Sequence, residues 1–210
     1  MSVFNYPEIH GAYTGPVDVR FLTDESFGLR VYIDTERLHL ASCGLDDVSR
    51  YARLFGDREV ASRYGGAPKT LPEIRCLIEG VWERLWRCCI PYSAFPIFDD
   101  LTDEFIGHIA VDPLANPGEA ELSVCLHKKF WGKRVGTEAI SAVVLRYLPL
   151  TISRGYLIHG KPLSLLTAVV RADNVAIGKI LNTLGFEKFV ECERKDGPAI
   201  IYQKSFSEAP

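Results

Sequence analysis

The stretch AELSVCLHKKFWGKRVGTEAISAVVLRYL, residues 120–148, decides the expected fold. It starts with the alternation of a strand, passes through a short basic loop containing Gly132 and Gly136, and continues as an apolar helical stripe. The first turn of a helix has free N–H groups and the positive end of the helix dipole, and both favour a bound phosphate. The stretch therefore predicts a strand, an anion-binding loop and a helix in succession. The alternative interpretation is an ordinary solvated basic loop.

The segments around this stretch predict the rest of a sheet. Before it, β-like runs at 92–98, 104–111 and 120–126 favour an antiparallel meander. After it comes the apolar run 163–170, and the succession of strand, helix, buried strand and helix implies a crossover and a locally parallel pair. A helix over 177–184 and a closing hairpin complete the chain. The expected fold class is α/β: a mixed, mostly antiparallel twisted sheet with a locally parallel central pair and flanking helices.

The N-terminal part is predicted to be simpler. Residues 17–22 and 29–33 alternate around a turn and predict a hairpin, so we treat residues 1–34 as an N-terminal extension and residues 35–210 as the main domain. Helices are predicted after Asp47 and after Thr70, whose hydroxyl and Glu73 form a capping-box pattern.

Composition excludes several classes of protein. The chain has 210 residues, of which 47% are hydrophobic, and its net charge is −3, so neither a nucleic-acid partner nor a membrane partner is expected. Its six cysteines show no CxxC pair and no zinc spacing, which predicts reduced thiols and no metal site. The N-terminal residues lack the pattern of a signal peptide, so a cytoplasmic location is expected. No GxxxxGK[ST] or GxGxxG motif occurs, which argues against nucleoside triphosphates and dinucleotides as ligands.

Two motifs in order resemble a known family. WGKRVGTEA after a strand, followed further along by RADNVAIGKILNTLGFEKF, resembles the GNAT superfamily of acyl-CoA-dependent N-acetyltransferases. TERLHL, DDVSRYARLF, EFIGHIAV and AELSVCL are similar to its branch of ribosomal-protein N-terminal and polyamine acetyltransferases. The resemblance covers about residues 35–204 and implies acetyl-CoA as acyl donor, with no metal. It implies direct attack by a primary amine in a ternary complex, the amine being a protein N-terminus, a polyamine or another small amine. We expect a monomer or a homodimer.

The resemblance also assigns cofactor-binding residues. It implies that the diphosphate lies on the loop and first helical turn, that the pantetheine arm pairs with the strand backbone, and that the last helix adds contacts. The implied residues are Val124, Leu126, Trp131, Gly132, Lys133, Arg134, Val135, Gly136, Thr137, Asn174 and Lys179. The alternative roles are a helix N-cap for Asn174 and a solvated surface charge for Lys179.

Arg134 stands where the family usually has glycine. If the backbone φ there is positive, the arginine strains or crowds the loop. If φ is negative, its amide still donates and its guanidinium grips a phosphate. We favour the negative value.

By the same analogy, Glu121 is the expected catalytic base and the N–H of Val124 the expected oxyanion donor. A surface ion pair is the alternative for Glu121, and Glu119 and His108 are reserve candidates. Leu181 occupies the place of a tyrosine that serves many relatives as general acid, so the acid is not identified. Cys125 is expected to be a core thiol.

Two other functions are left open by the sequence. Arg134 and Leu181 together motivate a catalytically silent acyl-CoA-binding or regulatory module, and a protein-interaction domain without cofactor is a third possibility. Trp82, Trp86 and Tyr92 belong either to the wall of an acceptor pocket or to ordinary core packing.

Overall fold

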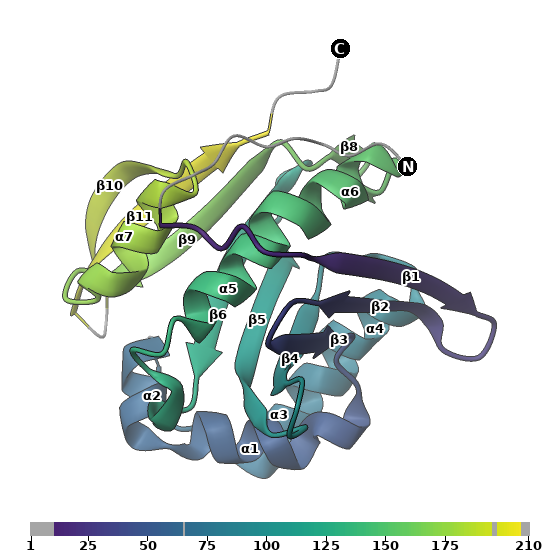
Figure 1. The fold of residues 1–210 in the computed structure, drawn as a ribbon, viewed down its shortest axis with the longest axis horizontal. Helices are drawn as coiled ribbons and strands as arrows, with labels where there is room; N and C mark the ends of the chain where they lie inside the picture. Colours follow the sequence, from purple (N-terminus) through teal and green to yellow (C-terminus); the bar gives the residue numbers. More distant parts are fainter. Residues whose placement is uncertain (1–10, 65, 195–196, 207–210) are drawn as a thin grey trace.

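A nine-stranded sheet forms the centre of the protein (Figure 1). The computed structural model describes residues 11–64, 66–194 and 197–206. The strands lie in the order β1, β2, β3, β4, β5, β6, β9, β11, β10, and β7 and β8 form a separate small ribbon. The strands are β1 Asp18–Asp24, β2 Gly28–Asp34, β3 Leu38–Ala41, β4 Ala94–Asp99, β5 Phe105–Pro113, β6 Glu119–Leu126, β7 Leu157–Ile158, β8 Lys161–Pro162, β9 Leu165–Arg171, β10 Glu187–Arg194 and β11 Gly197–Ser205.

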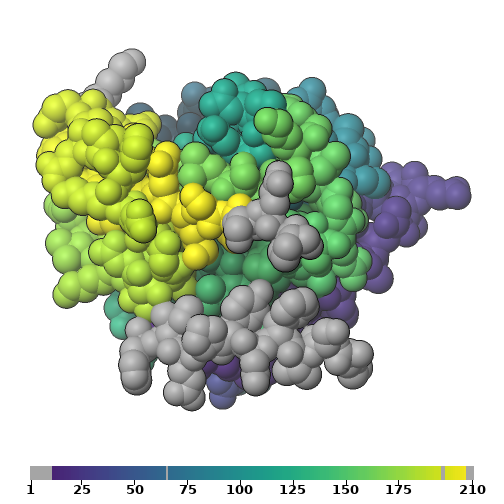
Figure 2. Space-filling view, turned by 90° about the horizontal axis from the view of Figure 1, so that it is seen from above, coloured from purple at the N-terminus to yellow at the C-terminus, as the bar shows by residue number. Residues whose placement is uncertain are grey.

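Every neighbouring pair in this sheet is antiparallel except β6 and β9, which are parallel. The predicted meander and the predicted central parallel pair are therefore both confirmed. The predicted N-terminal hairpin is also present as β1 and β2, and β2 pairs with β3, so the hairpin extends the main sheet. In Figure 2 it projects in purple on the side opposite the yellow-green part formed by α7 and β9 to β11.

Helices cover both faces of the sheet. The helices are η1 Leu45–Asp47, α1 Val48–Gly56, α2 Arg58–Tyr64, α3 Leu71–Leu77, η2 Ile78–Trp82, α4 Glu83–Arg87, η3 Lys128–Phe130, α5 Val135–Ala142, η4 Val143–Tyr147, α6 Leu148–Ser153 and α7 Val175–Thr183. The helices α1 to α4 cover one face, with Tyr51, Phe55 and Trp82 among the buried residues of that core. The predicted capping pattern is present at α3, where the Thr70 N–H donates to Glu73 Oε2 (2.7 Å).

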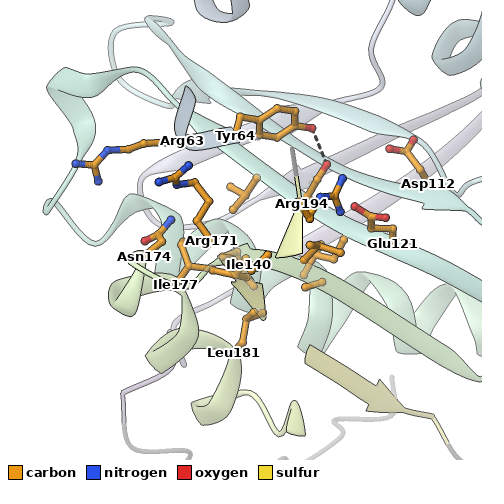
Figure 3. A pocket seen from close by; sticks show the side chains of 17 residues that line it. Arg63, Tyr64, Asp112, Glu121, Ile140, Arg171, Asn174, Ile177, Leu181 and Arg194 are labelled. Atoms are coloured by element: carbon orange, nitrogen blue, oxygen red, sulfur yellow. Dashed lines mark hydrogen bonds between the residues drawn. The ribbon is translucent and has the colours of Figure 1, made fainter. Parts of the chain in front are cut away.

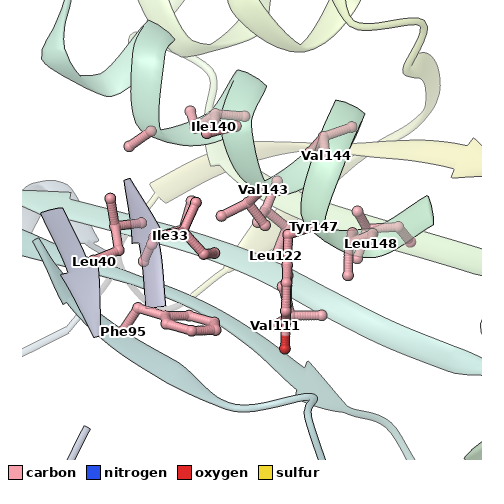
Figure 4. Packing of buried hydrophobic residues seen from close by; sticks show 14 of the residues in the cluster. Ile33, Leu40, Phe95, Val111, Leu122, Ile140, Val143, Val144, Tyr147 and Leu148 are labelled. Carbon is pink, nitrogen blue, oxygen red and sulfur yellow. The ribbon is translucent and has the colours of Figure 1, made fainter. Parts of the chain in front are cut away.

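The run α5, η4 and α6 covers the other face. Figure 4 shows Val143 and Tyr147 of this run lying between the helices and the sheet residues Ile33 and Leu122, in one cluster with Ile140 and Val144. The 19-residue segment Val135–Ser153 has the length and hydropathy of a membrane span, but 61% of its apolar window is buried inside the protein, as in a core helix. This packing fixes the position of the N-terminus of α5 over the sheet.

Candidate functional site

The central parallel pair opens partway along its length. β6 and β9 pair over Glu119–Glu121 and Leu165–Thr167, although β6 continues to Leu126 and β9 to Arg171. Beyond this point β6 remains paired with β5 on its other side. The second half of β6 therefore faces an opening between two strands.

The backbone of Val124 and Leu126 is directed into this opening. The His127 N–H donates to the Ile106 carbonyl (2.9 Å). In the β5–β6 register, this bond means that the N–H and C=O groups of Cys125 and Ser123 are directed toward β5. In an antiparallel ladder the alternate residues point their N–H and C=O groups away from that partner. The Val124 and Leu126 groups are therefore available for an added strand-like ligand, as the resemblance implies.

A cavity of about 490 Å³ runs from this strand to the N-terminus of α5. Its walls come from β6, from the loop after it, from the first turn of α5, and from α2 and α7. The lining residues that the sequence analysis assigned to the cofactor are Val124, Leu126, Trp131, Gly132, Arg134, Gly136, Thr137 and Asn174. The Trp131 indole N–H donates to the Leu126 carbonyl (2.9 Å) and so ties the loop to the strand.

Arg134 is the N-cap of α5 and has a φ of 63°. The interpretation that favoured a negative φ is therefore wrong: the position has the left-handed conformation for which the family glycine is suited. The side chain is exposed and lies at the edge of the cavity, so it does not close the cavity. The N–H groups of the first turn of α5, which have no acceptor within a helix, remain on the cavity side.

We expect Arg134→Gly to have two opposite effects. Removal of the left-handed strain should raise the free energy of unfolding by about 1 kcal/mol, measured by urea denaturation. Loss of the guanidinium should weaken acetyl-CoA binding about threefold, measured by calorimetry, because exposed charge contacts contribute little. Arg134→Asn is the control, since asparagine tolerates this conformation and also lacks the charge. Tighter binding by both variants would show that the arginine obstructs the cofactor.

A buried carboxylate holds the first turn of α5 in place. Glu138 accepts hydrogen bonds from Thr35 Oγ1 (2.7 Å), from the Arg37 backbone N–H (3.2 Å) and from Arg37 Nε (2.7 Å). Arg37 Nη1 also donates to the Lys133 carbonyl in the loop (3.4 Å). The turn between β2 and β3 therefore positions both the loop and the helix N-terminus.

Glu138→Gln should lower the free energy of unfolding by about 2 kcal/mol, because an amide NH₂ would face the Arg37 donors and leave them unpaired. Urea denaturation measures the change. Lys128→Gln is the control, because its ion pair with Glu59 is exposed and should contribute less than about 1 kcal/mol. Equal changes in the two variants would contradict the anchoring role of Glu138.

A second cavity of about 190 Å³ lies at the divergence of β6 and β9 (Figure 3). It shares Arg63, Tyr64, Val124, Asn174 and Ile177 with the first cavity, so the two are contiguous. Two acidic residues line it, and both are partly buried.

These acidic residues are Glu121 and Asp112, which are direct partners in the β5–β6 register. Burial raises the pKa of Glu121, and the charge of Arg194 lowers it in part. Burial raises the pKa of Asp112 to about 6, opposed by a hydrogen bond from Trp82 and helped by repulsion from Glu121. The sequence analysis found Glu121 but missed Asp112.

The same cavity is lined by Tyr64 of α2, which was not among the residues predicted from the sequence. Its hydroxyl donates to Ser123 Oγ (2.8 Å) and lies 3.3 Å from His108 Nε2, whose other ring nitrogen contacts the Tyr51 hydroxyl (3.0 Å). Burial lowers the pKa of His108 to about 3, so this histidine is neutral and enclosed between two tyrosines.

Several predicted residues lie outside both cavities. Lys179 is exposed on α7, Lys133 lies over the Phe130 ring, and Val135 packs in the core. Neither reserve base, Glu119 or His108, lines a cavity; Glu119 accepts from Asn116 at the start of β6.

Asn174 and Leu181 both line the smaller cavity. Asn174 is the N-cap residue of α7, as the alternative interpretation has it, but its side chain makes no capping hydrogen bond. Burial raises the pKa of Cys125, which keeps its thiol protonated. Of the three aromatic residues, Trp82 contacts the site through Asp112, whereas Trp86 is fully buried and the Tyr92 hydroxyl donates to the Tyr156 carbonyl.

The residues present fit a coenzyme A molecule. Gly136 lines the large cavity, and a Cβ there would stand 3.4 Å from Leu126 Cδ1, so the glycine keeps the space beside the helix N-terminus open. The main-chain N–H groups at the N-terminus of α5 suit a diphosphate. The free edge of β6 suits the pantetheine arm, whose amides can pair with a strand. Among the residues that the structure describes, no cluster of potential metal ligands occurs.

Comparison with known proteins agrees with this geometry. A family model described as an acetyltransferase (GNAT) domain matches residues 37–187. No curated protein sequence matches significantly. Among solved structures, the ribosomal-protein-S5-alanine acetyltransferase from Vibrio fischeri is 15% identical with a TM-score of 0.65, over 83% of this chain and 96% of that chain.

Two further structures are similar in fold. An acetyltransferase from Agrobacterium tumefaciens is 22% identical with a TM-score of 0.63, over 83% of this chain and 94% of that chain. A ribosomal L7/L12 alpha-N-protein acetyltransferase in complex with coenzyme A is 16% identical with a TM-score of 0.63, over 81% and 95%. At these identities the structures show the fold, and the family model covers most of the sequence. The chain therefore belongs to the GNAT acetyltransferase family.

Proposed function

We propose that the protein transfers acetyl from acetyl-CoA to a primary amine by direct attack in a ternary complex. The observation that carries this proposal is the pair of contiguous cavities, one along β6 and the N-terminus of α5, the other lined by Glu121. The first cavity suits a cofactor and the second an amine. We also propose a cytoplasmic location and a monomeric or homodimeric state, as the sequence favours.

The proposed cofactor site consists mainly of backbone. The N–H groups of Val135, Gly136 and Thr137 bind the diphosphate, with Arg134 at its edge. Val124 and Leu126 bind the pantetheine arm, although Trp131 already uses one lone pair of the Leu126 carbonyl. Acetyl-CoA supplies a thioester whose carbonyl carbon is the electrophile.

The proposed chemistry takes place where the two cavities meet. Glu121 takes a proton from the acceptor ammonium, because its burial favours the protonated form. The Val124 N–H donates to the oxygen on which negative charge develops. Leu181 lies in the same cavity and has no proton to give, so we assign proton donation to sulfur to a water molecule.

The acceptor is a primary amine of one of three kinds. One similar fold is a ribosomal-protein-S5-alanine acetyltransferase, and another modifies the N-terminal serine of ribosomal protein L7/L12, which supports a protein N-terminus. A polyamine and other small amines remain in the proposal, because fold does not determine substrate.

The test measures binding and turnover separately. Calorimetry with acetyl-CoA is followed by an assay of CoA release with a peptide beginning with alanine, a peptide beginning with serine, spermidine and butylamine. Binding together with amine-dependent release supports the proposal. Binding without turnover above spontaneous hydrolysis would establish the silent acyl-CoA module instead. No binding at millimolar acetyl-CoA would favour a protein-interaction domain.

A further inference from the structure

Asp112 and Glu121 form a pair of like-charged side chains across two strands. They are direct partners in the β5–β6 register, and such partners project from the same face of the sheet. Figure 3 shows both carboxylates in the smaller cavity. Two ionised carboxylates so placed repel each other unless a proton or another cation joins them.

Asp112 is held in one orientation. The indole N–H of Trp82 donates to Asp112 Oδ1 (3.0 Å), and Trp82, the last residue of η2, is itself buried against Tyr51 of α1. This bond uses one carboxylate oxygen and leaves Oδ2 for a ligand. An aspartate with a purely structural role in this position would be expected to have a cationic partner. The pKa of Asp112 is instead set by burial, by the hydrogen bond from Trp82 and by the charge of Glu121.

The groups around the pair favour a cationic ligand. Trp82 of η2, Tyr64 of α2 and His108 of β5 are neutral, and Arg194 of β10 acts on Glu121. Two further arginines line the cavity: Arg171 of β9 is paired with Asp173, and the Arg63 guanidinium of α2 lies over the Trp131 ring. Because the pKa of Asp112 is about 6, its carboxylate is largely ionised above that pH and faces Glu121 across the two strands. A ligand ammonium between them would relieve their repulsion.

We propose that Asp112 is a second catalytic carboxylate, which binds the acceptor ammonium together with Glu121 and shares the proton that the nitrogen loses. This proposal rests on the acetyltransferase function proposed above. It assigns the smaller cavity to a cationic primary amine.

The acceptor nitrogen loses two protons during the reaction. The acceptor enters as an ammonium ion, one N–H bond breaks, and the proton passes to the carboxylate pair. The freed lone pair forms a C–N bond at the thioester carbonyl carbon, and the C–S bond breaks with its electrons leaving on sulfur. The nitrogen loses a second proton; of the two protons released, one ends on the coenzyme A thiol and one passes to solvent.

Asp112→Asn tests the proposal, because asparagine keeps the size of the side chain and an acceptor for Trp82. With spermidine and the serine peptide as probes, the KM for the amine should rise about tenfold, while the Kd for acetyl-CoA stays within twofold. The acid limb of kcat/KM should also move to lower pH, because Glu121 loses a neighbouring negative charge and its pKa falls. Asp112→Glu, which restores the charge, should recover part of the affinity.

Asp100→Asn is the matched control, since Asp100 is an exposed aspartate in the turn between β4 and β5 and lines neither cavity. It should change neither KM nor the acid limb. An unchanged KM and acid limb in Asp112→Asn would overturn the role of Asp112 and leave the proposed function intact. A parallel loss of acetyl-CoA binding would also overturn it, by showing a structural role. If the unaltered protein binds acetyl-CoA but releases no CoA with any amine, both proposals fail.

Discussion

Gly136→Trp should weaken acetyl-CoA binding by at least about 100-fold. The indole would extend into the cavity beside Leu126 and exclude the diphosphate from the first turn of α5. Loss of two charge-assisted hydrogen bonds, each contributing about 1.5–3 kcal/mol, accounts for this factor, because 1.4 kcal/mol corresponds to tenfold. Calorimetric titration with acetyl-CoA measures it.

Gly136→Ala is the control for this prediction. Its Cβ would stand 3.4 Å from Leu126 Cδ1, which requires only a small adjustment, so the Kd should remain within about threefold. Thermal denaturation establishes that both variants fold, since a tryptophan at this buried position also costs stability. An unchanged Kd in the folded tryptophan variant would remove the α5 N-terminus from the cofactor site.

The sequence was sufficient for the order of the elements that form the sheet. The meander that ends at residue 126 and the crossover that follows it were predicted from local patterns. Strand alternation and helical periodicity depend only on neighbours in the chain. Helix α2, Arg58–Tyr64, was not predicted because seven residues with two buried side chains give no clear periodicity. This omission also hid Tyr64, which reaches the site from that helix.

The lining of the large cavity, where we propose that the cofactor binds, was easier to predict than the lining of the smaller cavity. Backbone sites follow from a motif and its place after a strand, which is why most of the loop residues line the large cavity. Asp112 belongs to the site only through its register with Glu121, and register depends on the turn between β5 and β6 as well as on side-chain pattern. The sequence signal for Asp112 was its position directly after the apolar strand pattern of residues 104–111.

Arg134 shows the limit of reasoning from one residue type. Arginine is unfavourable at positive φ, so its presence suggested a negative value. The surrounding structure overrides this preference, because Arg37 and Glu138 hold the loop and the helix start in place. The family glycine was the better indicator of the backbone conformation.

Glu121→Gln should lower kcat by about 10²- to 10⁴-fold, the usual contribution of a general base, and leave the Kd for acetyl-CoA within twofold. Glutamine keeps the shape of the side chain but cannot accept the ammonium proton. In the unaltered enzyme, activity should fall as the pH decreases through the raised pKa of Glu121, because the protonated carboxyl cannot act as a base. The glutamine variant should lose this acid limb. Steady-state CoA release over a range of pH gives both quantities.

The result depends on comparison with a carboxylate of the same strand. Glu119 lies two residues before Glu121 and projects from the same face of β6, but it lies outside both cavities. Glu119→Gln should therefore keep kcat within about twofold. Equal losses in the two variants would indicate a general effect of charge on the acceptor. An unaltered pH profile in Glu121→Gln would remove Glu121 as the base and transfer that role to Asp112, the other carboxylate of the pair, because it alone would still be placed to take the proton in this cavity.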